Sequence, residues 1–271
     1  MSVKLKSIVA ISALLGTLIL AGCDQEPRDP DHIKVGVIVG PELEVAEVAK
    51  KVAKEKYGLD VELITFNDYV LPNESLNKGD IDVNVFQHKP FLDQQVKERN
   101  YKLTIVGNSF IYPIAAYSRK IKSLGELENG NQITIPNDPT NQGRALLLLQ
   151  KQGLITLKEG VGLLPTVLDI INNPKDLDIV ELEAPQLPRS LDDQKIAFAI
   201  INNAYAGQVG LTPEQDGLFV EDKDSPYVNI IVSREDNKDA ENVQKFVKAY
   251  QSEEVEQAAQ RIFKGGALKG W

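Results

Sequence analysis

The sequence predicts an α/β protein built as two similar lobes. Apolar, β-rich runs alternate with stretches of helical periodicity, and short polar joins separate them. This alternation occurs in two successive series, one that begins at Ile33 and one that begins at Ile133. Strand–helix–strand units with short joins require neighbouring parallel strands. Because ligands of such sheets bind beyond the carboxyl ends of the strands, two facing lobes would share a cleft that closes by hinge motion.

The first series begins with an apolar strand at residues 33–39, which ends in Gly40-Pro41. A helix is expected from Glu42 to Tyr57, because apolar residues recur on one face and Gly58 provides a C-cap. The same patterns predict strands at residues 61–66, 83–86 and 102–106 and helices at residues 72–78 and 89–99.

The second series follows an extended piece at residues 111–117. It has expected strands at residues 133–135, 179–182 and 196–201 and expected helices at residues 144–152 and 163–171. Extended pieces at 219–220 and 227–232 precede a helical C-terminal stretch from Asn237 to Phe263.

Residues 1–22 have the pattern of a secretory signal: a short positive region, an uncharged apolar stretch and small residues before Cys23. The apolar stretch, residues 7–20, is shorter than the roughly 20 residues of a membrane span. Leu20-Ala21-Gly22-Cys23 resembles a bacterial lipobox, in which the thiol is lipidated and the chain is cut before the cysteine; the alternative is a cysteine without a role. Residues 23–31 are polar and contain two prolines, which predicts a flexible tether.

The composition excludes several classes of protein. Removal of residues 1–22, which contain two lysines and no acid, changes the formal net charge from −9 to −11. No Lys/Arg cluster is present that could neutralise a row of phosphates, so no nucleic-acid partner is expected. A single cysteine excludes an intrachain disulfide and disfavours a cysteine-based metal site, and no cofactor is expected. The sequence lacks nucleophile-elbow, phosphate-loop and metal-helix motifs, which favours binding over catalysis.

The loop at residues 136–143 and Arg144 after it form the first candidate site. Free N–H groups at a helix start, with Thr140 and Asn141 as capping candidates, favour an anion. Arg144 is unusual in a first helical turn, where the helix dipole favours acids. Its guanidinium could bind a ligand carboxylate through paired hydrogen bonds. The alternative is an exposed arginine on an ordinary capped helix.

Aromatic residues gather at the end of the third expected strand. Phe86 and His88 alternate along the chain, Phe91 follows in the next helix, and Tyr69 ends the preceding strand–loop unit. These four residues could form the wall of an apolar slot, or they could belong to the core.

Two asparagines, Asn202 and Asn229, follow or interrupt apolar strands. Because a buried amide needs partners, each is expected to bond to neighbouring backbone or to a ligand.

Several motifs carry a resemblance that extends over essentially the whole chain. They are Lys34-Val35-Gly36-Val37, Phe66-Asn67-Asp68-Tyr69, residues 82–90 with Phe86-Gln87-His88-Lys89-Pro90, residues 136–144, Glu183-Ala184-Pro185-Gln186-Leu187-Pro188-Arg189, Tyr227-Val228-Asn229 and the terminal Lys269-Gly270-Trp271. With these motifs the sequence resembles the methionine-binding members of the NlpA family of ABC-transporter solute-binding proteins.

The resemblance implies a two-lobed periplasmic-binding-protein fold of type II-like architecture, with a mixed sheet flanked by helices in each lobe. By analogy with such folds, lobe I would comprise residues 33–110 plus 228–271, and lobe II residues 111–227. It also implies a monomeric receptor, anchored by lipid on Cys23 at the periplasmic face of the inner membrane. The receptor would deliver methionine to an ABC permease with a cytoplasmic ATPase.

The resemblance also implies a role for each candidate residue. Arg144 would hold the ligand carboxylate, and Asn141, Asn202 and Asn229 would surround the amino-acid head. The side-chain slot would be lined by Tyr69, Phe86, His88 and Phe91. Position 91 is Phe where Tyr is common in the family, which puts a hydroxyl contact there in doubt. The alternatives are a receptor for another amino acid or dipeptide, or a surface lipoprotein that transports nothing.

Overall fold

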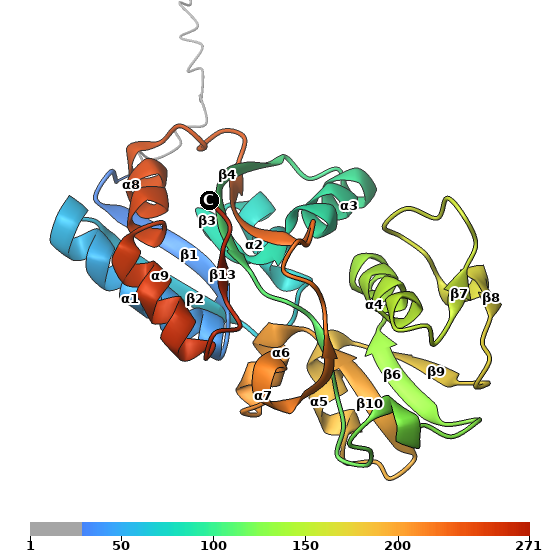
Figure 1. Cartoon of the computed structure of the whole chain (residues 1–271). Helices are drawn as coiled ribbons and strands as arrows, with labels where there is room; N and C mark the ends of the chain where they lie inside the picture. The colour runs from blue at the N-terminus through green and yellow to red at the C-terminus, as the bar shows by residue number, and fades with distance from the viewer. Residues whose placement is uncertain (1–28) are drawn as a thin grey trace, which may run out of the picture.

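The structure, a computed structural model, describes residues 29–271. It has two lobes, each built on its own mixed β-sheet with helices packed against it (Figure 1). The predicted α/β architecture with a mixed sheet in each lobe is therefore confirmed. The expected signal segment and Cys23 lie outside the described residues. No helix among residues 29–271 is both long and apolar enough to cross a membrane.

The first lobe is built on a six-stranded sheet in the order β13-β4-β12-β3-β1-β2. Strand β1 runs parallel to β2 and β3, whereas β12 runs antiparallel to β3 and β4. The strands are β1 (His32–Ile38), β2 (Asp60–Phe66), β3 (Val83–His88), β4 (Leu103–Ile111), β12 (Val228–Arg234) and β13 (Leu268–Lys269).

Five helices accompany this sheet: α1 (Pro41–Tyr57), α2 (Leu71–Lys78), α3 (Lys89–Arg99), α8 (Glu241–Tyr250) and α9 (Glu253–Ile262). Helix α1 packs against α8 and α9, and together they bury apolar side chains such as Val45 and Phe246 with the sheet residue Val35. As predicted, α1 ends at Gly58, whose φ of 66° is the left-handed conformation that glycine adopts without strain.

The second lobe has a five-stranded sheet in the order β11-β5-β10-β6-β9 and a small hairpin of β7 (Thr156–Leu157) and β8 (Ile170–Asn172). The sheet strands are β5 (Ala115–Tyr117), β6 (Gln132–Pro136), β9 (Asp178–Leu182), β10 (Ile196–Ile201) and β11 (Gly217–Val220). Its helices are α4 (Pro139–Lys151), α5 (Leu187–Ser190), α6 (Asn203–Gln208) and α7 (Pro213–Asp216), with 3₁₀ turns η1 (Leu124–Glu126), η2 (Val167–Asp169) and η3 (Ala184–Gln186).

The helix predicted at residues 163–171 is wrong. This segment contains the short turn η2 and strand β8 instead. The apolar residues that suggested helical periodicity do not face a core, since Leu164 is 50% and Leu168 82% exposed. Gly162, with a φ of 62°, has a left-handed backbone conformation directly before the point where the helix would start.

The C-terminal helical stretch predicted at residues 237–263 consists of two helices, α8 and α9. The break lies at Gln251 and Ser252, where the Ser252 hydroxyl accepts a hydrogen bond from the Val255 N–H. A serine N-cap followed by acids in the first turn starts a new helix. Both helices carry the same apolar spacing, because both pack on α1, and this concealed the break.

Two segments connect the sheets. The first sheet takes its strands from residues 32–111 and 228–269, and the second from residues 115–220. The connections β4–β5 and β11–β12 therefore both pass between the lobes. They lie side by side, since the Glu221 N–H donates to the Ile114 carbonyl oxygen at 2.9 Å. The exact lobe limits stay a prediction.

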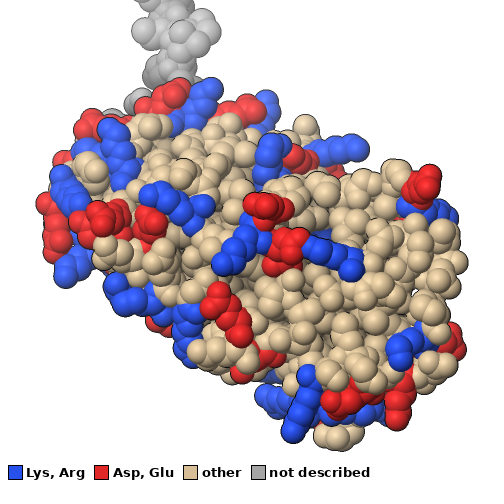
Figure 2. Space-filling model, viewed as in Figure 1, with Lys and Arg blue, Asp and Glu red and all other residues tan. Residues whose placement is uncertain are grey.

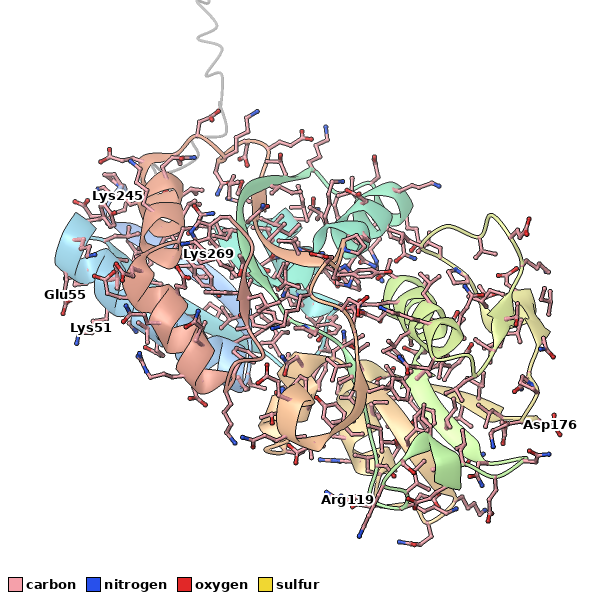
Figure 3. All side chains as sticks on the ribbon, viewed as in Figure 1. Lys51, Glu55, Arg119, Asp176, Lys245 and Lys269 are labelled. Atoms are coloured by element: carbon pink, nitrogen blue, oxygen red, sulfur yellow. The ribbon has the colours of Figure 1, made fainter. Side chains whose placement is uncertain are left out.

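Charged residues of both signs alternate over the visible face of the first lobe, whereas much of the face over α4 and the β7–β8 hairpin is uncharged (Figure 2). Lys245 on α8, labelled in Figure 3, pairs with Glu241 at 3.0 Å and with Asp31 at 2.9 Å. The Asn242 amide also donates to the carbonyl oxygen of His32 at 2.8 Å. The last residues of the predicted tether that are described, 29–31, thus contact α8.

Candidate functional site

A pocket lies between the lobes and is lined by residues of both. The pocket brings together all eight residues that the sequence singled out: Tyr69, Phe86, His88, Phe91, Asn141, Arg144, Asn202 and Asn229. It is also lined by five residues that the sequence reasoning missed: Glu42, Gln87, Tyr112, Asn203 and Ala204.

Three aromatic rings form one wall of the pocket. Tyr69 follows β2, Phe86 lies in β3 and Phe91 in the first turn of α3. The ring centroids of Phe86 and Phe91 are 6.0 Å apart in an edge-to-face arrangement, and Tyr69 lies 5.8 Å from Phe86 and 6.1 Å from Phe91. Such a wall provides apolar contact area together with ring edges, which suits a flexible apolar or thioether side chain.

His88 joins this wall to the second lobe. It ends β3 and caps α3, since its Nδ1 accepts a hydrogen bond from the Phe91 N–H at 3.2 Å. The other nitrogen, Nε2, therefore carries the proton and donates to Asn141 Oδ1 at 3.2 Å. Burial, followed by the guanidinium of Arg144, lowers the pKa of His88 to about 3, so the ring is neutral at physiological pH.

Asn141 is held in one orientation by its neighbours. Its Nδ2 donates to both carboxylate oxygens of Asp138, at 3.1 and 2.9 Å. Its Oδ1 then accepts from Asn202 Nδ2 at 2.8 Å and from His88. Because the carboxylate accepts only, the amide cannot flip without losing these bonds. The site thus presents a prearranged row of polar groups beside the aromatic wall.

The start of α4 differs from the prediction. Asp138 is the N-cap and accepts a hydrogen bond from the Asn141 N–H at 3.0 Å, so the predicted caps Thr140 and Asn141 lie inside the helix. An aspartate before a proline is a common helix start, and Asp138-Pro139 in the sequence already carried this signal. Consequently Arg144 lies in the second turn and not in the first.

Arg144 is only 3% exposed, which excludes the alternative of an exposed arginine. Its Nε donates to Glu221 Oε1 at 2.9 Å, and its Nη2 bonds to Glu221 Oε2 and to the Tyr112 carbonyl oxygen. The guanidinium carbon lies 4.4 Å from the centre of the Tyr227 ring. Arg144 therefore contacts both connections between the lobes, and its burial is compensated by a carboxylate and an aromatic face.

Asn229 bonds to backbone, whereas Asn202 bonds to the side chain of Asn141. Asn229 Nδ2 donates to the Phe86 carbonyl oxygen at 3.2 Å and lies 3.5 Å from Glu42 Oε1. Asn202 precedes α6, and its Oδ1 receives no hydrogen bond from residues 29–271. Gln87, which the sequence reasoning missed, forms two 2.7 Å hydrogen bonds with the buried Asn73 and thereby supports β3 beneath the pocket.

Among residues 29–271, no group of three or more His, Cys, Asp or Glu side chains could hold a metal ion. The polar groups of the pocket are instead amides, tyrosine hydroxyls, the neutral imidazole of His88, a guanidinium and a carboxylate. They lie beside an apolar wall. The arrangement can recognise a small molecule that has a charged or polar head and an apolar tail.

A model of the NlpA lipoprotein family matches residues 33–271. The chain belongs to this family. The D-methionine-binding lipoprotein MetQ of Yersinia pestis is 74% identical over 271 residues, which cover the whole of both chains. The crystal structure of a methionine-binding protein, MetQ, is 74% identical and superposes with a TM-score of 0.89 over 90% of this chain and 99% of that chain.

A further similar structure is that of a nutrient-binding protein from Burkholderia cenocepacia bound to methionine. It is 51% identical, with a TM-score of 0.86 over 88% of this chain and all of that chain. The two sheets and the pocket between them, together with these similarities, establish the two-lobed periplasmic-binding fold that the resemblance implied.

Proposed function

We propose that this chain is a solute-binding receptor that captures methionine and delivers it to an ABC importer. The observation that carries the proposal is the pocket, which brings together an aromatic wall, a buried guanidinium and a row of oriented amides. Relatives with 74% identity are named for methionine binding, and a 51% identical neighbour is described as bound to methionine. These names describe binding lipoproteins, not enzymes.

The ligand carboxylate would bind Arg144. Among residues 29–271, the hydrogen bonds of this guanidinium leave from Nε and Nη2, and Nη1 is the nitrogen that we assign to the ligand. Asn141, Asn202 and Asn229 would surround the amino-acid head. The thioether would lie against Tyr69, Phe86, Phe91 and the neutral ring of His88, since sulfur packs favourably against ring edges.

The two lobes would be residues 33–110 plus 228–271 and residues 111–227. Ligand capture would close them about the two connecting segments, as in other hinged binding proteins. The hydrogen bond between His88 and Asn141 links the first lobe to the second across the pocket, which supports a role for both residues in closure.

The receptor would work at the periplasmic face of the inner membrane, as a monomer anchored by lipid on Cys23. An anchor keeps the receptor at a high local concentration near its permease and the cytoplasmic ATPase. The relatives named as lipoproteins support this arrangement.

Calorimetry tests the proposal. The mature chain with Cys23→Ala, unfolded and refolded to remove bound ligand, should bind methionine. Arg144→Lys should weaken binding at least about tenfold, because an ammonium cannot pair with Glu221 through two nitrogens and still present a third nitrogen to the ligand. Arg119→Lys is the matched control, since Arg119 forms an exposed pair with Asp192 and neither residue lines the pocket.

Heat with another amino acid or a dipeptide, but none with methionine, would overturn the substrate and leave the receptor class intact. A surface lipoprotein without transport predicts a different result: no ligand at any concentration, and uptake of methionine by cells that is unchanged by Arg144→Lys.

A further inference from the structure

Glu42 is a carboxylate inside the pocket. It lies in the first turn of α1, lines the cavity between the lobes and is only 4% exposed. Acids are common in a first helical turn because they favour the positive end of the helix dipole. Burial is what sets Glu42 apart from Glu44, the other acid in this turn, whose side chain is exposed.

The partners of this carboxylate are few. Its Oε2 receives no hydrogen bond from any residue among 29–271. Its Oε1 lies 3.5 Å from Asn229 Nδ2, at the long limit of a hydrogen bond. Burial raises the pKa of Glu42 well above its ordinary range, and no cation offsets this effect. A buried carboxylate without a cation is costly, so such groups are usually paired.

The charges that face Glu42 leave a place for a cation. The carboxylate interacts electrostatically with tyrosine side chains from both lobes: Tyr69, Tyr112, Tyr205 and Tyr250. Two other titratable residues line the same pocket. Arg144 is already paired with Glu221, and His88 is neutral. Because Glu221, which lies outside the pocket lining, already neutralises Arg144, no cation is left for Glu42, and aromatic rings around a carboxylate suit an ammonium group.

We propose that Glu42 is the acceptor for the α-ammonium group of the ligand. The inference rests on the proposed function and extends it. The zwitterion would span the pocket from Glu42 in the first lobe to Arg144 in the second, so both charges of the ligand find a buried partner of opposite sign. This makes Glu42 the residue that separates α-amino acids from hydroxy acids with the same side chain, because a hydroxyl carries no charge.

The test compares two ligands on three proteins. The ligands are methionine and its hydroxy analogue, 2-hydroxy-4-(methylthio)butanoate, and the proteins are wild type, Glu42→Gln and Glu44→Gln. Binding is measured by calorimetry, with displacement titrations for weak ligands. Glu42→Gln should weaken methionine binding roughly 10- to 100-fold, the usual range for a hydrogen bond to a charged group. The hydroxy analogue should bind Glu42→Gln as well as or better than it binds the wild type.

Glu44→Gln removes the same charge from the same helical turn outside the pocket, and it should leave both affinities unchanged. An unfolding measurement on each variant shows whether it is folded, and Glu42→Asp, which keeps the charge, should retain part of the preference for methionine. The proposal is overturned if Glu42→Gln weakens both ligands equally, or behaves as Glu44→Gln does. If the wild type binds no methionine, the proposed function fails instead.

Discussion

Acid should destabilise the ligand-free protein through one buried side chain, His88. The pKa of this imidazole is about 3 in the folded protein and 6.5 ordinarily. Because the folded pKa is depressed, the unfolded chain binds a proton that the folded protein refuses, and stability is lost as the pH falls below 6.5 towards 3. Protonation would place an N–H at Nδ1, where the Phe91 N–H already donates.

The size of the effect follows from the gap between the two pKa values. Each pH unit below 6.5 costs about 1.4 kcal/mol of folding free energy until the folded pKa is reached. At about pH 4.5 the contribution of His88 is therefore roughly 3 kcal/mol relative to neutral pH, a large part of the stability of an ordinary domain.

Urea unfolding of the refolded, ligand-free protein at about pH 7 and pH 4.5 measures this loss. His88→Asn removes the titrating group but keeps a side-chain acceptor for the α3 cap. Between about pH 7 and pH 4.5 this variant should therefore lose about 3 kcal/mol less unfolding free energy than the wild type loses. His32→Asn is the control, because it removes the other of the two histidines, which lies at the surface. Equal pH dependence in wild type and His88→Asn would refute the reasoning.

Three further changes test an ion pair, a close backbone approach and a helix cap. Glu221→Gln should lower the free energy of unfolding by roughly 3 kcal/mol, because it removes the charged partner of the buried Arg144; an unchanged urea midpoint would contradict this. Gly143→Ala should cost about 1–3 kcal/mol, since its Cβ would lie 2.3 Å from a carbonyl oxygen of the β7–β8 loop. Gly125→Ala, whose Cβ would meet only a side chain at 3.6 Å, is the control, and equal melting temperatures of the two would count against the argument. Ser252→Ala should lower the free energy of unfolding by about 1 kcal/mol, because α9 loses its N-cap hydrogen bond. Chemical unfolding measures this change, and an unchanged free energy would mean that the cap does not stabilise the protein.

Most strands and helices could be predicted because their signals are local. The apolar run of β1, the amphipathic α1 and its Gly58 cap all lie within a few residues of one another. The failures have local causes too. The leucines of residues 163–171 have helical spacing but no core to pack against, and Ser252 divides two helices that share one packing partner.

For the site, residue type was informative where it was unusual for its context. An arginine early in a helix and an aromatic group at a strand end pointed to Arg144 and Phe86, which do meet in one pocket. An acid in the first turn of a helix is ordinary, so Glu42 gave no such signal. That Glu42 is buried with an unpartnered carboxylate oxygen becomes visible only when α1 is packed against the rest of the first lobe.

The sequence by itself determined most strands and helices of the two main sheets, the division into two α/β series and the family, because these depend on local periodicity and on motifs spread along the whole chain. Only the tertiary structure decided which charges are paired. Arg144 and Glu221 are 77 residues apart, and Glu42 and Asn229 are 187 residues apart. Whether a carboxylate lies beside a guanidinium or without a cation depends on how segments that are distant in the sequence pack together. Burial then sets the pKa of the carboxylate and the ligand group that it suits.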